Sequence, residues 1–276
     1  MNIQKIAAFS DGGCGGNPAG VVIADALPDA ATMQAVAAQV GFSETAFAAP
    51  RDDAWTVRYF SPESEVPFCG HATIAPGAAL AEACGEGVFK LALAASEITV
   101  EGREDPENGF LAALQSPPTR SAPADEQLVS GALALFGLNE ADLDGRIPPA
   151  FAEAGASHLV LALKQRARLA GMAYDLDAGR RLMRRFGLVT IALVWVENDH
   201  LFHVRNAFAS GGVLEDPATG AAAAAFSGYL RDIDWPHGGA IDLIQGEDMG
   251  MKSLLHAEIP DLPGSSIRVS DRIRRM

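Results

Sequence analysis

Hydrophobic and polar positions along the chain show one order of elements that occurs twice. In the first copy, a 3.6-residue period predicts an amphipathic helix at 29–40, which ends at Gly41. Alternating apolar positions then predict strands at 44–48 and 55–60, and a nearly all-apolar stretch predicts a helix at 71–83. This order is helix, strand, strand, buried helix.

The second copy repeats that order further along the chain. A helix at 176–186 ends at Gly187, strands are expected at 189–196 and 201–208, and another apolar helix is expected at 219–230. Matching positions lie 146, 147 and 148 residues apart, namely Gly41 and Gly187, Val57 and Val204, and Cys69 and Pro217. So regular a spacing indicates an internal duplication.

The apolar helix of each copy has small or apolar side chains on nearly every side, at 70–83 and 218–230. A helix at a protein surface would present a polar face, so both helices must be surrounded by other elements. We therefore predict an α+β fold of two pseudo-symmetric half-domains, each a strand-rich, barrel-like sheet around a central helix. Pro76 lies in the first helix and predicts either a late helix start or a kink.

Pro and Ser are concentrated between 115 and 125, which predicts a linker between the halves because Pro cannot donate to a strand ladder. The half-domains are then expected at 1–115 and 125–258. A last strand is expected at 266–276, and it could pair with the first half or with the second.

Charge and composition narrow the function classes. The 276-residue chain has a net charge of −14 and a pI of about 4.8, which disfavours nucleic acid and anionic membrane surfaces as partners. No stretch has the roughly 18 apolar residues of a membrane span, and no signal peptide is evident at the start. Three cysteines, without a Cys-x-x-Cys pair, predict a reducing, cytoplasmic setting.

Neither a metal nor an organic cofactor is predicted. The six histidines are scattered, and the Gly-rich runs fit neither a phosphate-binding loop with its Lys nor a dinucleotide turn.

Candidate chemistry gathers where the two apolar helices begin, because free N–H groups at a helix N-terminus attract a carboxylate or phosphate. Glu44 lies at a strand start among apolar neighbours, His71 at the first helix start, and Asp216 close before the second. Each has a plainer interpretation: Glu44 as a strand-edge residue, Asp216 as a helix cap, and Cys69 as a small buried apolar group. For His71 we expect a neutral ring, since a helix N-terminus disfavours the imidazolium.

Five segments of the chain form recognisable motifs: GNPAGVV (16–22), GFSETAF (41–47), RYFSPESEVPFCGHATI (58–74), EDPATGAAAAA (215–225) and QGEDMG (245–250). With these motifs, nearly the whole chain resembles the PhzF-like phenazine-biosynthesis family, which has the fold of diaminopimelate epimerase. The resemblance implies an isomerase with its active site between the two halves, acting on a small carboxylated substrate without a cofactor. It also implies a homodimer.

By motif match, Glu44 corresponds to the acid/base that moves the proton, and His71 and Asp216 to residues that hold the substrate and assist. Ser43, with the helix starts at Gly70 and Gly220, matches substrate-contacting positions. Ala72 and Ala221 belong to the same helix starts, and Ala221 stands where many relatives carry Ser. We expect an apolar cleft to raise the pKa of Glu44 and so make it a better base toward carbon.

Two rival functions stay open. One is a cysteine-dependent racemase or epimerase with Cys69 as its thiol. Epimerases of this fold use two cysteines, but the second position here is Pro217. The other is a non-catalytic binding protein on the same scaffold.

Overall fold

The computed structural model describes residues 1–276 except 12, 67–68, 95–96 and 106–108. Pro67 and Phe68 of the motif at 58–74 thus lie outside the described residues. The chain divides into two compact units, unit 1 with 1–115 and 270–276, and unit 2 with 116–269.

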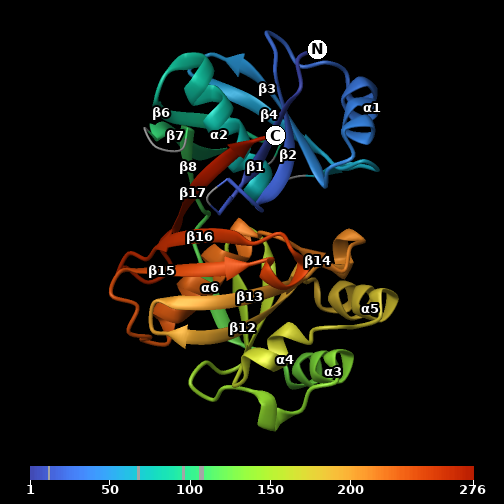
Figure 1. The fold of residues 1–276 in the computed structure, drawn as a ribbon, viewed down its shortest axis with the longest axis vertical. Coiled ribbons are helices and arrows are strands. Elements are labelled where there is room, and N and C mark those ends of the chain that lie inside the picture. Colours follow the sequence, from blue (N-terminus) through green and yellow to red (C-terminus); the bar gives the residue numbers. More distant parts are fainter. Residues whose placement is uncertain (12, 67–68, 95–96, 106–108) are drawn as a thin grey trace. The chain divides into compact units, whose positions relative to one another are not determined.

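Unit 1 consists of strands around one central helix (Figure 1). Its elements are β1 (Gln4–Ala8), β2 (Asn17–Ile23), α1 (Ala30–Val40), β3 (Glu44–Arg51), β4 (Ala54–Phe60), β5 (Glu65–Val66), α2 (Gly70–Cys84), β6 (Gly87–Ala92), β7 (Glu97–Asp105), β8 (Gly109–Gln115) and most of β17 (Arg268–Arg275). The C-terminal strand β17 pairs antiparallel with β1.

Helix α2 is the core of unit 1. Every residue from Gly70 to Ala81 is buried, and the helix contacts β1, β2, β3, β6, β7 and β8. Gly77 and Gly102 allow the closest approach, because a Cβ on Gly102 of β7 would lie 2.2 Å from the Gly77 carbonyl oxygen. Pro76 lies seven residues into α2, so it is an interior residue and not part of the first turn.

Unit 2 has the same plan with additional helices. Its elements are β9 (Arg120–Pro123), α3 (Glu126–Phe136), η1 (Glu140–Asp142), β10 (Ala150–Glu153), β11 (Ser157–Leu163), α4 (Arg166–Ala170), α5 (Leu176–Phe186), β12 (Thr190–Asn198), β13 (Leu201–Ala207), η2 (Ala209–Gly211), β14 (Glu215–Asp216), α6 (Gly220–Asp232), β15 (Ala240–Gln245), η3 (Glu247–Met249) and β16 (Ser253–Glu258). Its central helix α6 is buried from Gly220 to Arg231 and contacts β9, β10, β11 and β16.

Strand pairing repeats between the units. In unit 1, β2 pairs parallel with β3, β3 antiparallel with β4, and β4 parallel with β6. In unit 2, β11, β12, β13 and β15 follow the same sequence of pairings. The predicted fold of two pseudo-symmetric, strand-rich halves around apolar helices is therefore confirmed. The helix ends at Gly41 and Gly187 are also as predicted, both in the left-handed region with φ of 73° and 66°.

The predicted linker at 115–125 is wrong in part. Residues Arg120–Pro123 form β9, which pairs antiparallel with β10 in unit 2. The strand tolerates Pro123 because Pro is its last residue, where a ladder donor can be spared. Pro content alone therefore misplaced an edge strand as a connection.

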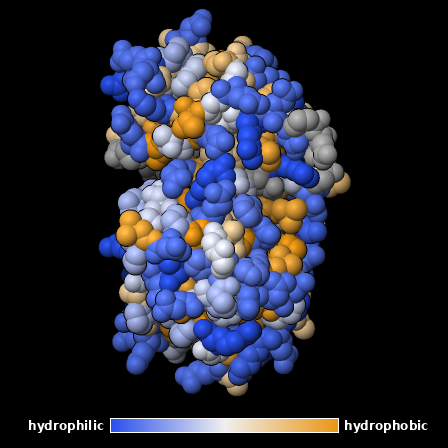
Figure 2. All heavy atoms as spheres, turned by 90° about the vertical axis from the view of Figure 1, so that its left-hand side faces the viewer, coloured by the Kyte–Doolittle hydropathy of each residue, from blue (hydrophilic) through white to orange (hydrophobic). Residues whose placement is uncertain are grey.

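The face drawn in Figure 2 is mainly hydrophilic, and its apolar residues form small separate patches. No helix among the described residues has both the length and the apolar character that a membrane crossing requires.

Candidate functional site

Glu44, Cys69 and His71 form one cluster in unit 1. Glu44 begins β3, Cys69 is the N-cap of α2, and His71 is in the first turn of that helix. His71 Nε2 lies 3.1 Å from Glu44 Oε2, and His71 Nδ1 lies 3.3 Å from Cys69 Sγ. The imidazole thus stands between a carboxylate and a thiol.

Burial differs within the cluster. Glu44 and His71 are 6% and 3% exposed, whereas Cys69 is half-buried and Ser43 is exposed. Ser43 Oγ lies 3.3 Å from His71 Nε2, on the side where Glu44 contacts the ring. Two of the predicted substrate-contacting residues, Gly70 and Ala72, are buried in the first turn of α2 on either side of His71. The structure therefore brings Ser43, Glu44 and His71 together.

Electrostatics in this cluster contradict two expectations from the sequence. Burial alone would raise the pKa of Glu44, but its contacts with His71, and to a smaller degree Ser43 and Cys69, lower that pKa below the usual value. Burial alone would lower the pKa of His71, but Cys69 and Glu44 together raise it well above the usual value. The pair is accordingly a carboxylate beside an imidazolium, not a neutral acid beside a neutral ring.

The Cys69 thiol behaves differently from its two neighbours. Burial and the nearby Glu44 charge raise its pKa above the usual value, although His71 acts in the other direction. The pKa of Cys69 thus shifts in the direction opposite to that of Glu44. None of the three cysteines, Cys14, Cys69 or Cys84, is in a disulfide.

A second hydrogen-bonded chain fixes the helix start that carries His71. The buried Tyr59 hydroxyl lies 2.7 Å from Thr73 Oγ1, and that hydroxyl donates to the Cys69 carbonyl oxygen over 2.7 Å. Thr73 has one proton to donate, so Tyr59 must donate to Thr73. Sequence reasoning missed both residues, although Tyr59 and Thr73 lie inside the motif at 58–74.

Asp216 anchors the corresponding polar cluster of unit 2. It is buried on β14 and accepts a hydrogen bond from Thr219 Oγ1 at 2.5 Å. Gln245 joins them, because its Nε2 donates to the Asp216 carbonyl oxygen at 2.7 Å and its Oε1 accepts from the Thr219 N–H at 3.2 Å. The structure therefore links the predicted Asp216 to Gln245, a residue of the motif at 245–250 that sequence reasoning did not assign.

The N-cap residue of α6 is Thr219, and its own side chain makes no capping hydrogen bond. Gly220 and Ala221 form the first turn, both buried, so their position at the helix start is as predicted. The N-cap Cys69 of α2 likewise makes no side-chain capping bond.

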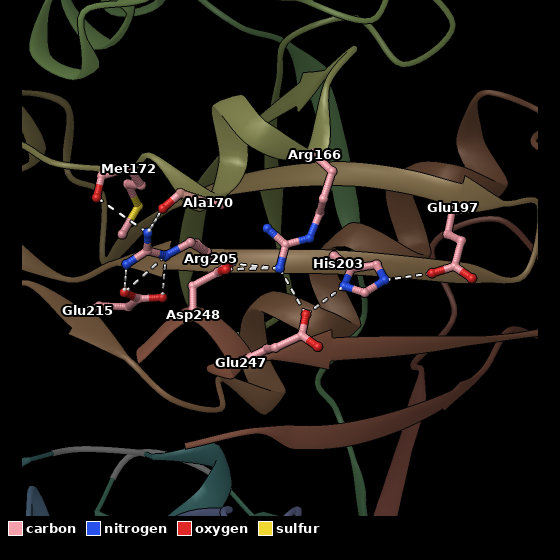
Figure 3. A network of polar contacts seen from close by, with 9 residues as sticks. All are labelled: Arg166, Ala170, Met172, Glu197, His203, Arg205, Glu215, Glu247 and Asp248. Carbon is pink, nitrogen blue, oxygen red and sulfur yellow. Dashed lines mark hydrogen bonds and ion pairs between the residues drawn. The ribbon is translucent and has the colours of Figure 1, made fainter. Parts of the chain in front are cut away.

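An ion pair links β13 and β14, the strand that carries Asp216 (Figure 3). Arg205 donates to both carboxylate oxygens of Glu215, at 3.0 and 2.5 Å, and also to the carbonyl oxygens of Ala170 and Met172. Glu215 is the residue before Asp216, so this bidentate pair holds the strand that carries Asp216. The available signal was Arg205, a charged residue in a strand whose sequence is LFHVRNA.

A further part of the same network reaches the turn after Gln245. Arg166 donates to Glu247 and Asp248, and His203 lies between Glu247 and Glu197 (Figure 3). These contacts fix η3, which begins two residues after Gln245.

Comparison with known proteins places the chain in a family. The family model for phenazine biosynthesis-like proteins (PhzC-PhzF) matches residues 6–275. A protein of Mesorhizobium japonicum named as an uncharacterized isomerase is 31% identical over 260 residues, covering 88% of this chain and 85% of its own. The YddE protein of Escherichia coli K12, also named an uncharacterized isomerase, is 29% identical, with 88% and 84% covered.

Solved structures show the same fold. A predicted epimerase from Pseudomonas aeruginosa has a TM-score of 0.85 at 25% identity, covering 99% of this chain and 96% of its own. A PhzF-family protein of Bacillus anthracis has a TM-score of 0.83 at 20% identity, with 100% and 98% covered. A probable proline racemase from Agrobacterium radiobacter shares the fold at a TM-score of 0.68 and 13% identity, with 99% and 90% covered. With a family model that spans nearly its whole length and relatives named as isomerases, the chain belongs to the phenazine biosynthesis-like family and is an enzyme of the isomerase class.

Proposed function

We propose that this enzyme moves a proton on a small carboxylated substrate, with Glu44 as the acid/base and without a cofactor. The observation that carries the proposal is the buried contact between Glu44 and His71 at the start of α2. Membership in a family of isomerases supports the reaction class.

The charges of the pair suit a division of roles. Glu44, ionised at neutral pH, is ready to accept a proton from carbon, and it returns that proton at a second position on the same substrate face. His71, held as an imidazolium, stabilises the negative charge that develops on the substrate as the proton leaves. One carboxylate thus serves as base first and acid second.

Substrate binding is assigned to the two helix starts. The N-cap residues Cys69 and Thr219 make no side-chain capping hydrogen bond, and the helix starts at Gly70–Ala72 and Gly220–Ala221 are proposed to bind an anionic group. Ser43 and Asp216 are proposed to contact the substrate as well. We also predict that the substrate lies between the two halves. A cytoplasmic location and a homodimer are further predictions.

Isotope exchange tests the proposal. The protein is incubated in D₂O with a panel of small unsaturated or cyclic carboxylic acids, and NMR follows deuterium uptake at carbon. We expect uptake with the wild type and a loss of about 100-fold or more in Glu44→Gln. The matched control is Glu63→Gln, which removes an exposed carboxylate of unit 1 and should leave exchange unchanged.

The outcomes separate the candidates. Uptake that persists in Glu44→Gln would contradict the role of Glu44. Ligands that bind without any uptake would favour the non-catalytic binding protein.

A cysteine-dependent reaction is the second candidate, because Cys69 Sγ lies 3.3 Å from His71 Nδ1. A two-thiol mechanism with one cysteine from each unit has no counterpart here, since Cys14, Cys69 and Cys84 all belong to unit 1. Cys69→Ser distinguishes the two. It should abolish exchange if the thiol carries the proton, and reduce it only in part if Glu44 does.

A further inference from the structure

We propose that Cys69, His71 and Glu44 form a binding site for a thiophilic divalent metal ion, with Zn²⁺ as the representative. Each residue offers one ligand atom, and the three atoms lie within 4.8 Å of one another. Among the described residues this is the group of metal-ligating side chains that the structure brings together. The proposal does not rest on the proposed function, because metal binding is measured without a substrate.

The distances suit tetrahedral coordination. With Zn–S near 2.3 Å and Zn–N near 2.0 Å, two ligand atoms of a tetrahedral site stand roughly 3.5 Å apart. Cys69 Sγ and His71 Nδ1 are 3.3 Å apart, so one ion can contact both with little movement of either side chain. They are two residues apart at the start of α2, where the helix holds them in place.

Glu44 is the third protein ligand. Its Oε2 is buried and lies 3.1 Å from His71 Nε2, without the geometry of a hydrogen bond. A rotation of this carboxylate toward the thiol would give the ion a third ligand. A thiolate and a carboxylate together balance the two charges of Zn²⁺, so the buried site would be neutral.

Ser43 supplies the outer support that metal-bound histidines require. When Nδ1 binds the ion, Nε2 carries the proton and needs an acceptor. Ser43 Oγ lies 3.3 Å from Nε2 and takes that role once Glu44 has turned to the metal. Cys69 is half-buried, so solvent can reach the fourth position.

The ligand types select the metal. A thiolate with an imidazole favours Zn²⁺, Co²⁺ and related ions, whereas Mg²⁺ and Ca²⁺ require oxygen ligands. The bound ion would occupy Glu44 and His71, so it would compete with any use of these residues as acid/base. The site is therefore inferred to be inhibitory.

Titration with Co²⁺ tests the proposal, because a cobalt–thiolate bond gives a near-ultraviolet charge-transfer band. The protein is the full-length Cys14→Ser/Cys84→Ser variant, in which Cys69 is the remaining thiol. We expect a band that saturates at one ion per chain and is abolished by Zn²⁺ but not by a large excess of Mg²⁺. His71→Ala and Glu44→Gln on this background should weaken Co²⁺ binding, His71→Ala by about 100-fold or more.

A second measurement does not depend on whether a variant folds. The rate at which iodoacetamide alkylates Cys69 is compared with and without Zn²⁺, and protection of at least tenfold is expected. No charge-transfer band, or a band unaffected by His71→Ala in protein with wild-type circular dichroism, would overturn the proposal. So would alkylation at the same rate in the presence of saturating Zn²⁺.

Discussion

His158 makes the stability of unit 2 depend on pH in a way that can be calculated. The residue is 1% exposed on β11, and its Nδ1 lies 2.7 Å from Thr190 Oγ1. Thr190 donates its proton to Asn206 Oδ1 over 3.0 Å, so His158 must donate from Nδ1. His158 Nε2 then carries a buried lone pair without a hydrogen-bond partner.

Burial lowers the pKa of His158 to about 3, because a proton on Nε2 would place an uncompensated charge in the core. The unfolded chain has a histidine pKa near 6.5. Since the folded pKa is the lower one, the unfolded state binds the extra proton, and stability is lost as the pH falls from about 6.5 toward 3. Each pH unit in that window costs about 1.4 kcal/mol, which gives about 2 kcal/mol at pH 5.

Urea unfolding of the wild type and of His158→Gln at pH 7.5 and pH 5 measures this effect. Glutamine is neutral at both pH values. Between pH 7.5 and pH 5, the His158→Gln variant should therefore lose about 2 kcal/mol less stability than the wild type. His200→Gln, which replaces an exposed histidine in the turn before β13, is the control and should follow the wild type. If His158→Gln loses as much stability as the wild type, the assignment of a buried neutral His158 is wrong.

Two further predictions concern packing and charge. Arg205→Met leaves the buried Glu215 carboxylate without its partner and should lower the free energy of unfolding by about 3–5 kcal/mol in a urea titration. Adding Glu215→Leu should restore most of that loss, and no restoration would contradict the pairing. Gly102→Ala places a methyl group against the Gly77 carbonyl oxygen and should lower the melting temperature, at a cost of about 1–3 kcal/mol. Gly87→Ala, on a neighbouring strand where no atom lies within 4 Å of the added methyl, should cost much less.

The local sequence pattern was enough to predict most of the helices and strands. Helices that end at Gly41 and Gly187 follow from apolar periodicity and from a left-handed position that Gly adopts at low cost. The burial of α2 and α6 follows from the lack of a polar face. The linker at 115–125 failed because Pro is a weak guide at the ends of edge strands, as β9 shows.

Pairing across the sheet was not available from local pattern. In unit 2, Thr190 pairs with His158 of the parallel strand β11. In unit 1, Glu44 pairs in the same way with Ala19 of β2. Thr190 therefore occupies in unit 2 the position that Glu44 has in unit 1. The duplication in the sequence predicts this correspondence only within a residue or two. The register of the strands fixes it, and it shows that the two copies carry different chemistry at one position.

The sequence by itself determined the duplication and the buried helices, because each leaves a repeated or contiguous pattern along the chain. Its motifs also named the residues of the candidate site. Only the tertiary structure decided the direction in which the pKa values of Glu44 and His71 shift. Glu44 and His71 are 27 residues apart in the chain, yet their contact at 3.1 Å helps to outweigh the burial that would raise the pKa of Glu44. Cys69 and Glu44 together outweigh the burial that would lower the pKa of His71. Charge interactions depend on distance in space and on exclusion of solvent, and neither quantity can be taken from the order of residues.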